Sequence, residues 1–198
     1  MEKSIAVLPG DGIGPEIVRE ALKALRAVEQ KFGHRFQYTE ALIGAAAIDA
    51  TGDPYPQSTH ELCLSADAIL FGAIGHPRFD NDPSAKVRPE QGLLRMRSAL
   101  GLYANIRPVK SYEALLDASP LKNDRVRGVD FVVVRDLISG IYFGKPRGRD
   151  EAGTTAFDTC VYTKDEILRI TAKAFEFARN RRKHVTLLDK ANVLATSR

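Results

Sequence analysis

Three arginines are the side chains of this sequence best suited to bind a small anion. Arg107 ends a predicted strand that begins at Leu102, and Arg135 directly follows three consecutive valines. Arg97 shares the apolar stripe of a predicted helix with Leu93. A guanidinium group binds a carboxylate through two parallel hydrogen bonds, and burying it without an anionic partner is costly. The arginines therefore predict a site for a substrate with two carboxylates or, as the alternative, three separate internal pairs with Asp or Glu.

The elements that must position these side chains are predicted from apolar runs and helical periodicity. Strands are expected at residues 4–8, 35–43, 68–74, 102–109, 129–134 and 184–188, and helices at 15–32, 45–50, 58–65, 90–100, 164–178 and 189–198. Thr163 and Glu166 predict a capping box at the start of the helix at 164–178, and Gly33 is expected to end the first helix. Strands alternating with helices predict a mainly parallel α/β sheet, whose ligands bind at the carboxyl ends of strands.

Other polar residues fall at the same predicted strand ends. Lys190 and Asn192 follow the strand at 184–188, and Gly75 follows the strand at 68–74. Residues 76–89 are expected to form a polar loop, 110–128 a loop or weak helix, and 139–163 an extended arm or a hairpin.

Several familiar motifs are excluded by spacing. The turn Gly10-x-Gly12-x-Gly14 lacks the G-x-G-x-x-G spacing of a dinucleotide fingerprint, and Gly144-Lys145 lacks the Ser or Thr of a P-loop. The histidines are scattered, which disfavours a zinc site, and no G-x-S-x-G of a serine hydrolase occurs.

Composition is that of a globular protein. The chain has 198 residues, a net charge of +4, 44% hydrophobic and 27% charged residues, which excludes disordered and collagenous classes. No apolar run is long enough for a membrane-spanning helix, and the N-terminus does not resemble a signal peptide. Two cysteines outside any C-x-x-C favour a reducing, cytoplasmic location. The basic run at 179–183 is expected to end a helix rather than bind nucleic acid.

Five segments, taken in order, carry a resemblance to a known family. They are Val7–Glu16, Gly92–Arg97, Tyr103–Pro108, Gly140–Gly148 and Asp189–Leu194. Together they resemble the decarboxylating β-hydroxyacid dehydrogenases, the family of the isocitrate and isopropylmalate dehydrogenases.

The resemblance implies a two-domain fold with a mixed, mainly parallel sheet that is not a Rossmann fold, incomplete at the C-terminus in this chain. Residues 1–101 correspond to the N-terminal half of a cofactor-binding domain. Residues 102–198 correspond to part of a substrate-binding and dimerisation domain, with an arm at 144–163 that pairs with its partner in an intersubunit sheet.

The implied reaction is the NAD-dependent oxidative decarboxylation of 3-isopropylmalate in leucine biosynthesis, assisted by Mg²⁺ or Mn²⁺. Lys190 corresponds to the general base and Tyr142 to the acid that protonates the enol. The substrate is held by the three arginines with Leu93, and Asn192 and Val193 lie beside them. In the implied homodimer, Lys190 and Asn192 of one subunit face the arginines and Tyr142 of the other.

The implied cofactor residues are Ile13, Gly75, His76, Pro77 and Glu90. No metal ligand is expected within the chain, since the family's metal-binding aspartates correspond to positions beyond Arg198. No nucleic-acid or membrane partner is expected.

Substrate choice is predicted from Leu93, whose apolar side chain suits an isopropyl group and leaves a third carboxylate unpaired. Should Leu93 only pack in the core, D-malate, tartrate or isocitrate becomes the alternative substrate. Two departures from the family pattern are His76, in place of a Gly, and the segment Asp136–Ser139, which replaces the usual Glu and Gly.

Family members continue well past Asn192. We therefore expect the 198-residue chain to be inactive alone and to be an unstable monomer, because it would expose sheet edges and apolar faces. A non-catalytic fragment that only associates is the competing hypothesis.

Overall fold

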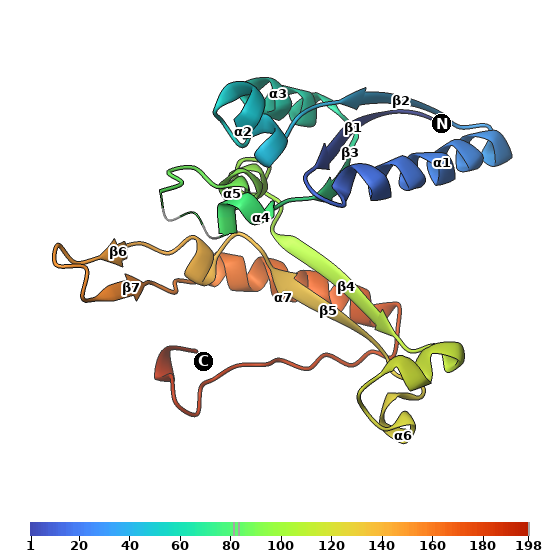
Figure 1. The fold of residues 1–198 in the computed structure, drawn as a ribbon. Coiled ribbons are helices and arrows are strands. Elements are labelled where there is room, and N and C mark those ends of the chain that lie inside the picture. The colour runs from blue at the N-terminus through green and yellow to red at the C-terminus, as the bar shows by residue number, and fades with distance from the viewer. Residues whose placement is uncertain (81, 83, 198) are drawn as a thin grey trace. The chain divides into compact units, whose positions relative to one another are not determined.

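The structure is a computed structural model that describes residues 1–80, 82 and 84–197. The chain divides into two units, Met1–Gly101 (unit 1) and Leu102–Arg198 (unit 2). Each unit is described by itself below, and Figure 1 shows the elements of both.

Unit 1 is built on a three-stranded parallel sheet in the order β2-β1-β3. Ile5 of the central strand lies opposite Tyr38 of one neighbour and Ala68 of the other. Each crossover between parallel strands carries helical structure, as parallel pairing requires. The elements are β1 (Glu2–Gly10), α1 (Gly14–Phe32), β2 (Arg35–Glu40), α2 (Ala45–Thr51), α3 (Gln57–Ser65), β3 (Ala68–Ala73), α4 (Pro77–Asp80) and α5 (Pro89–Ala99).

The core of unit 1 lies on both faces of β1, because successive side chains of a strand point to opposite faces. Ile5 and Val7 pack with Val18 of α1 on one face. Ala6 and Leu8 pack on the other face in a cluster completed by Ile43, Tyr55, Cys63 and Met96. The apolar run at the start of the chain is therefore a strand buried on both sides.

The turn from β1 into α1 follows the sequence prediction. Pro15 lies in the first helical turn, where its missing N–H is not needed, and Gly33 ends the helix with φ +65°. A Cβ on Gly14 would lie 2.1 Å from the Pro9 carbonyl oxygen, so only glycine lets the helix start this close to the sheet.

Unit 2 is built on two antiparallel strand pairs, β4 with β5 and β6 with β7. The second pair is the hairpin predicted within 139–163. The elements are β4 (Ala104–Lys110), the 3-10 helix η1 (Glu113–Ala118), α6 (Asn123–Val126), β5 (Asp130–Asp136), η2 (Gly140–Tyr142), β6 (Arg147–Arg149), β7 (Ala156–Asp158), α7 (Lys164–Arg179) and η3 (Ala195–Ser197).

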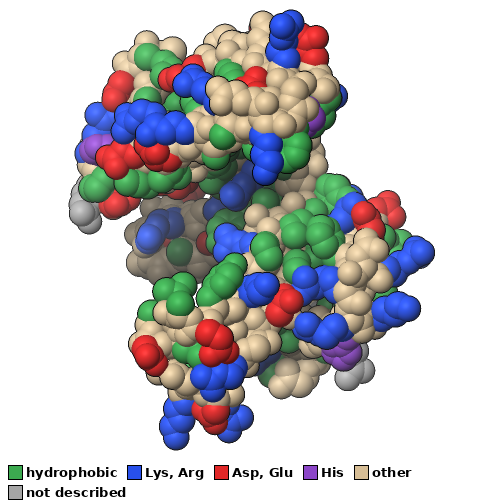
Figure 2. Space-filling model, turned by 90° about the vertical axis from the view of Figure 1, so that its right-hand side faces the viewer, with side chains coloured by type: hydrophobic (Ala, Val, Ile, Leu, Met, Phe, Trp, Pro, Cys, Tyr) green, Lys and Arg blue, Asp and Glu red, His purple; other side chains and the backbone are tan. Residues whose placement is uncertain are grey.

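Helix α7 begins with the predicted capping box. The Glu166 amide donates to Thr163 Oγ1 at 3.3 Å, and the Thr163 amide donates to Glu166 Oε2 at 2.7 Å. The helix packs against β5, along which inward side chains alternate with exposed ones. Large apolar side chains nevertheless remain at the surface, and the view in Figure 2 shows hydrophobic side chains beside Lys and Arg.

Two expected elements near the end of the chain are wrong. Residues 184–188 form no strand, and in place of a helix over 189–198 the described residues show only a turn at 191–193 and η3. Arg198 lies outside the described residues. A strand needs a partner for its backbone groups, and β4 and β5 pair only with each other among the described residues.

Candidate active site

Two of the predicted cofactor residues, Gly75 and Glu90, lie together in unit 1, and Ile13 lies in the adjoining turn. Ile13 follows the β1–α1 turn and is 56% exposed. A Cβ on Gly12 would lie 3.6 Å from the Gly75 carbonyl oxygen, and a Cβ on Gly75 would lie 3.2 Å from Glu90 Oε1. The turn, the end of β3 and the start of α5 therefore form one surface of bare backbone, an apolar side chain and a carboxylate.

The predicted residues His76 and Pro77 lie at the start of α4, where both are exposed. His76 Nδ1 accepts from the Arg78 amide at 3.3 Å, and the Arg78 side chain forms an ion pair with Asp49 of α2 at 2.5 Å. This places His76 in a local turn tied to a neighbouring helix. The hydrogen bond from the Arg78 amide gives the His76 side chain a partner within this turn.

Arg88 holds the loop between α4 and α5 and was missed by the sequence analysis. Its guanidinium group donates to the Phe79 carbonyl oxygen and to that of Asp82, the latter at 2.8 Å. Hydrogen bonds from Ser84 to the Asp82 carboxylate hold the pKa of that group below its usual range. A cation flanked by a Pro-containing loop is the signal that could have identified it.

Helix α5 carries the predicted substrate residues Leu93 and Arg97, which are both half-buried. Leu93 packs against the core cluster of Leu8 and Met96. Packing alone therefore accounts for an apolar residue here, and the alternative of a core role stays open beside the substrate role.

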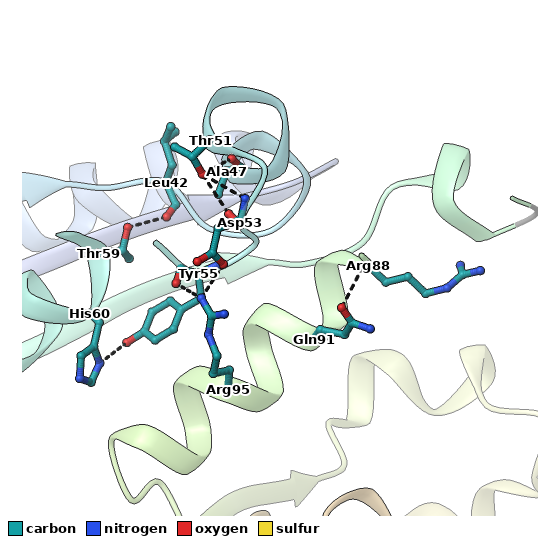
Figure 3. A network of polar contacts seen from close by, with 10 residues as sticks. All are labelled: Leu42, Ala47, Thr51, Asp53, Tyr55, Thr59, His60, Arg88, Gln91 and Arg95. Atoms are coloured by element: carbon teal, nitrogen blue, oxygen red, sulfur yellow. Dashed lines mark hydrogen bonds and ion pairs between the residues drawn. The ribbon is translucent and has the colours of Figure 1, made fainter. Parts of the chain in front are cut away.

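The opposite face of α5 is anchored by a polar network that the sequence did not predict (Figure 3). The Arg95 guanidinium group donates to the Tyr55 carbonyl oxygen and to Asp53 Oδ1, and its carbon lies 5.6 Å from the Tyr55 ring centre. The buried Tyr55 hydroxyl lies 3.1 Å from His60 Nδ1. A Cβ on Gly92 would lie 2.5 Å from the Pro54 carbonyl oxygen. These contacts fix the helix that presents Leu93 and Arg97.

In unit 2, strand register brings Arg107 and Arg135 to one face of the β4–β5 pair. Arg135 lies opposite Asn105, and Arg107 lies opposite Val133. Because residues two apart on a strand share a face, the two arginines are diagonal neighbours on that face. Both are exposed, and Arg107 Nε donates to Asn105 Oδ1 at 2.6 Å. The face therefore presents two exposed arginines as diagonal neighbours.

The predicted reason for this placement is wrong, although the two arginines do share a face. They do not lie beyond the carboxyl ends of parallel strands. Arg107 is the fourth residue of β4 and Arg135 the sixth of β5, and the strands are antiparallel. Their proximity comes from register.

Tyr142, the predicted acid, lies beside Arg135. The guanidinium carbon of Arg135 is 6.0 Å from the Tyr142 ring centre. The turn between them is held by Asp136, whose Oδ2 accepts from the Ser139 amide at 3.0 Å and from the Ser139 hydroxyl. Asp136 and Ser139, the two ends of the segment that departs from the family pattern, thus bind each other.

The same turn contacts a residue that sequence analysis missed. A Cβ on Gly140 would lie 2.5 Å from the Tyr162 hydroxyl oxygen, so the Tyr162 side chain packs directly on the backbone that leads to Tyr142. Tyr162 lay in the segment predicted only as an arm, and its spacing from other residues offered no signal.

The remaining predicted residues lie near the end of the described chain. Lys190, Asn192 and Val193 are exposed in a turn in which the Lys190 carbonyl oxygen accepts from the Val193 and Leu194 amides at 3.0 and 2.8 Å. The structure groups them with one another, and no hydrogen bond or ion pair of the described residues joins them to Arg107, Arg135 or Tyr142. Among residues 1–80, 82 and 84–197, no group of three His, Cys, Asp or Glu side chains could hold a metal ion. None of the described helices is long and apolar enough to cross a membrane.

Comparison with known proteins identifies the family. The family model described as isocitrate/isopropylmalate dehydrogenase matches residues 4–198, and the chain belongs to this family. The resemblance inferred from the five segments is therefore confirmed.

Curated relatives carry a more specific name. The chain is 54% identical to the "3-isopropylmalate dehydrogenase" of Bacteroides fragilis over 198 residues, covering 100% of this chain and 55% of the relative. It is 54% identical to the protein of that name from Aquifex aeolicus over 195 residues, covering 98% and 53%. The chain spans about half the length of the curated relatives it matches.

Solved structures confirm the fold class. The isocitrate dehydrogenase of Methylococcus capsulatus matches with a TM-score of 0.77 at 31% identity, covering 98% of this chain and 53% of that one. A β-decarboxylating dehydrogenase of Thermococcus kodakarensis matches with a TM-score of 0.67 at 34% identity, covering 98% and 51%. The α/β architecture is thus that of the dehydrogenase family.

Proposed function

We propose that this chain forms part of an NAD-dependent enzyme that oxidises and decarboxylates 3-isopropylmalate, in leucine biosynthesis. One observation carries the proposal. Arg107 and Arg135 share an exposed face with Tyr142 beside them, in a chain about half identical to relatives named for this activity. The N-terminal unit is assigned to cofactor binding and the C-terminal unit to substrate binding.

The arginines bind and orient the substrate. Two guanidinium groups on one face hold a carboxylate each or share one, because each presents a planar pair of donors. Arg97 of α5 is assigned to the substrate carboxylates on the family resemblance. Held in this way, the substrate presents its hydroxyl-bearing carbon in a fixed orientation, which lowers the entropic part of the barrier.

Two further residues of the chain move protons. In the proposed homodimer, Lys190 of one subunit removes the proton from the 2-hydroxyl of the substrate held by the arginines of the other, while the hydrogen on the same carbon leaves as hydride. After the carboxylate departs as carbon dioxide, the Tyr142 phenol returns a proton to the enol carbon. Asn192 and Val193 border the substrate in this assignment.

The surface of Ile13, Gly75 and Glu90 fits a nicotinamide cofactor. Glycine leaves backbone exposed where a ring would approach, since a Cβ on Gly75 would fill space beside Glu90. The exposed Ile13 side chain offers an apolar contact, and the Glu90 carboxylate can accept from ribose hydroxyls. His76 and Pro77 border this surface. NAD, when bound, supplies the acceptor for the hydride.

The described residues of this chain do not by themselves fit a divalent metal. We propose that Mg²⁺ or Mn²⁺ is held in the complete enzyme by carboxylates that correspond to positions beyond Arg198. We further propose a cytoplasmic homodimer in which the β6–β7 hairpin pairs with its partner.

The apolar Leu93 favours 3-isopropylmalate over a tricarboxylate. An apolar side chain suits an isopropyl group and leaves a third carboxylate without a partner, which discriminates strongly. Isocitrate is the second candidate, because a solved relative at 31% identity is named isocitrate dehydrogenase. D-malate and tartrate are the remaining alternative substrates.

The test is an assay of the natural protein that contains this sequence. Reduction of NAD is measured with Mn²⁺ and each of the four acids, and the highest kcat/KM is expected with 3-isopropylmalate. Arg107→Gln and Arg135→Gln are each expected to raise KM for the acid by about tenfold or more, because a hydrogen bond to a charged group is lost. The matched control is Arg127→Gln, because Arg127 is an exposed arginine of unit 2 paired with Glu113.

Equal effects of all three arginine substitutions would contradict the assignment, and a higher kcat/KM with isocitrate would favour the second candidate. We expect the 198-residue chain alone to show no turnover. Turnover by it would overturn that expectation, and an inactive natural protein that still associates would favour a non-catalytic role.

A further inference from the structure

Asp11 is a buried carboxylate to which the proposed reaction gives no role. It lies in the turn after β1 and is 5% exposed. Its Oδ2 accepts from the Ala45 amide at 2.8 Å and the Gly75 amide at 3.1 Å, and its Oδ1 accepts from the Ala46 amide at 3.0 Å. One side chain therefore binds two segments that lie far apart in the sequence.

Close packing holds this carboxylate in place. A Cβ on Gly44 would lie 2.3 Å from Asp11 Oδ2, and Gly44 has φ +78°, so glycine is required there. The Asp11 amide donates to the Ala73 carbonyl oxygen at 2.8 Å, which ties the turn to the last residue of β3. Gly44, which precedes α2, provides no side-chain cap, and Asp11 satisfies the first amides of that helix instead.

The chemistry of the contacts requires a carboxylate. Three N–H donors converge on two oxygens, and both oxygens accept. If an amide replaced the carboxylate, its one oxygen would still accept a hydrogen bond. Its NH₂ group would then face a backbone N–H, which is also a donor, and no bond would form there. Burying the charge is tolerable here because all three bonds are made to it, and hydrogen bonds to a charged group are the stronger kind.

The consequence concerns the surface assigned to the cofactor. Ile13 is two residues after Asp11, and Gly75, with φ +118°, is held by the Asp11 carboxylate and lies next to Glu90. We propose that Asp11 is a positioning residue for the nicotinamide cofactor, clamping the segments that carry Ile13 and Gly75 in the arrangement that binds it. This inference rests on the proposed function.

The experiment compares three variants of the natural protein that contains this sequence. Asp11→Asn retains the shape and can keep the bonds to Ala45 and Gly75, whereas Asp11→Ala removes all three. Thr59→Val is the matched control, because Thr59 is 1% exposed and its hydroxyl donates to the Leu42 carbonyl oxygen at 2.7 Å, not to Gly75. Kinetics with saturating 3-isopropylmalate and hydrogen exchange of the Gly75 amide are measured for each.

We expect Asp11→Asn to raise KM for NAD by about tenfold, from one lost bond to a charged group, with kcat changed much less. Asp11→Ala is expected to raise KM for NAD further and to speed hydrogen exchange of the Gly75 amide. Thr59→Val is expected to lower the thermal midpoint while leaving KM for NAD unchanged. A merely structural role of Asp11 would give the control's pattern.

The outcomes separate the two proposals. Absence of NAD-dependent turnover in the unmodified protein overturns the proposed function and the cofactor role of Asp11 with it. In an active protein, an unchanged KM for NAD in Asp11→Asn overturns only the role of Asp11. Should Asp11→Ala fail to fold, Asp11→Asn alone decides, and its pattern is read against Thr59→Val.

Discussion

The central strand of unit 1 is covered on both faces, whereas the β4–β5 pair of unit 2 is covered mainly on one. Ala6 and Leu8 are completely buried within unit 1. In unit 2, Phe131 and Val133 of β5 are 47% and 40% exposed on the face that carries Arg135. Among the described residues, Leu116 and Ala178 are the buried apolar side chains of unit 2.

This difference teaches how each set of candidate residues is held. In unit 1 the proposed cofactor surface rests on a packed core, the Asp11 contacts and the Arg95 network. In unit 2 the arginines are placed by strand register and by α7 beneath the strands. Stability should therefore be concentrated in unit 1, and four experiments test this difference.

The largest expected effect is in the core of unit 1. Leu8→Ala removes a fully buried side chain and should lower the free energy of unfolding of unit 1 by about 3 kcal/mol, through lost burial and a cavity. Phe131→Ala in unit 2 should cost less than about 1 kcal/mol, because much of that side chain is already in water. Urea-dependent hydrogen exchange of peptides from β1 and β5 measures both. Equal effects would break the comparison.

A smaller effect is expected at the start of α7. Thr163→Ala removes the hydroxyl that caps the Glu166 amide and should destabilise unit 2 by about 1 kcal/mol. Exchange of α7 amides should accelerate while β1 amides keep their rates. Thr163→Ser retains the hydroxyl and serves as the control. Acceleration in both units would mean that they unfold together.

Acid should weaken each unit through a different carboxylate. Hydrogen bonds from Lys3 and Ser4 lower the pKa of Asp67 from its ordinary value of 3.8 to about 2, and Arg181 lowers the pKa of Asp130. Because the pKa of Asp67 is lower in the folded than in the unfolded protein, the stabilisation that Asp67 provides is present above about pH 4 and is lost as pH falls toward 2. The stabilisation that Asp130 provides is likewise lost in acid.

Asp67→Asn should therefore reduce the acid-induced loss of stability in β1 and β3. Asp130→Asn should reduce the acid-induced loss of stability in β5. Hydrogen exchange at about pH 5 and about pH 3 tests this, bracketing the ordinary carboxyl pKa. An unchanged pH dependence in either variant would show that its carboxylate does not contribute.

The smallest effect is expected at an exposed ion pair. Arg127 Nε lies 3.1 Å from Glu113 Oε2, with side chains 57% and 71% exposed. Glu113→Gln should change stability by no more than about 0.5 kcal/mol, because water and salt screen such pairs. Thermal denaturation at low and high salt measures the change. A larger loss would mean that unit 2 depends on its surface charges.

Local signals in the sequence predicted much of unit 1. Pro15 and Gly33 mark the ends of α1, and the apolar run before Pro9 marks β1, because these positions depend on backbone preferences of the residues themselves. The capping box of Thr163 was predictable in unit 2 for the same reason.

What depends on partners could not be predicted. The segment 184–188 is as apolar as a strand, yet it has no neighbouring strand to pair with among the described residues. Arg107 and Arg135 were expected to meet at strand ends, but an antiparallel register brings them together. Asp11 and Arg95 act on backbone groups of distant segments, which no spacing in the sequence reveals.

Because β1 is the middle strand and precedes β2 and β3 in the chain, the centre of the sheet is synthesised before either of its neighbours. β1 pairs with β2 and with β3, and the last of these ends only at Ala73. The nascent strand therefore waits for some sixty further residues of synthesis before both of its edges are filled. During that interval it exposes apolar side chains and unpaired backbone groups, a natural point of engagement for a chaperone.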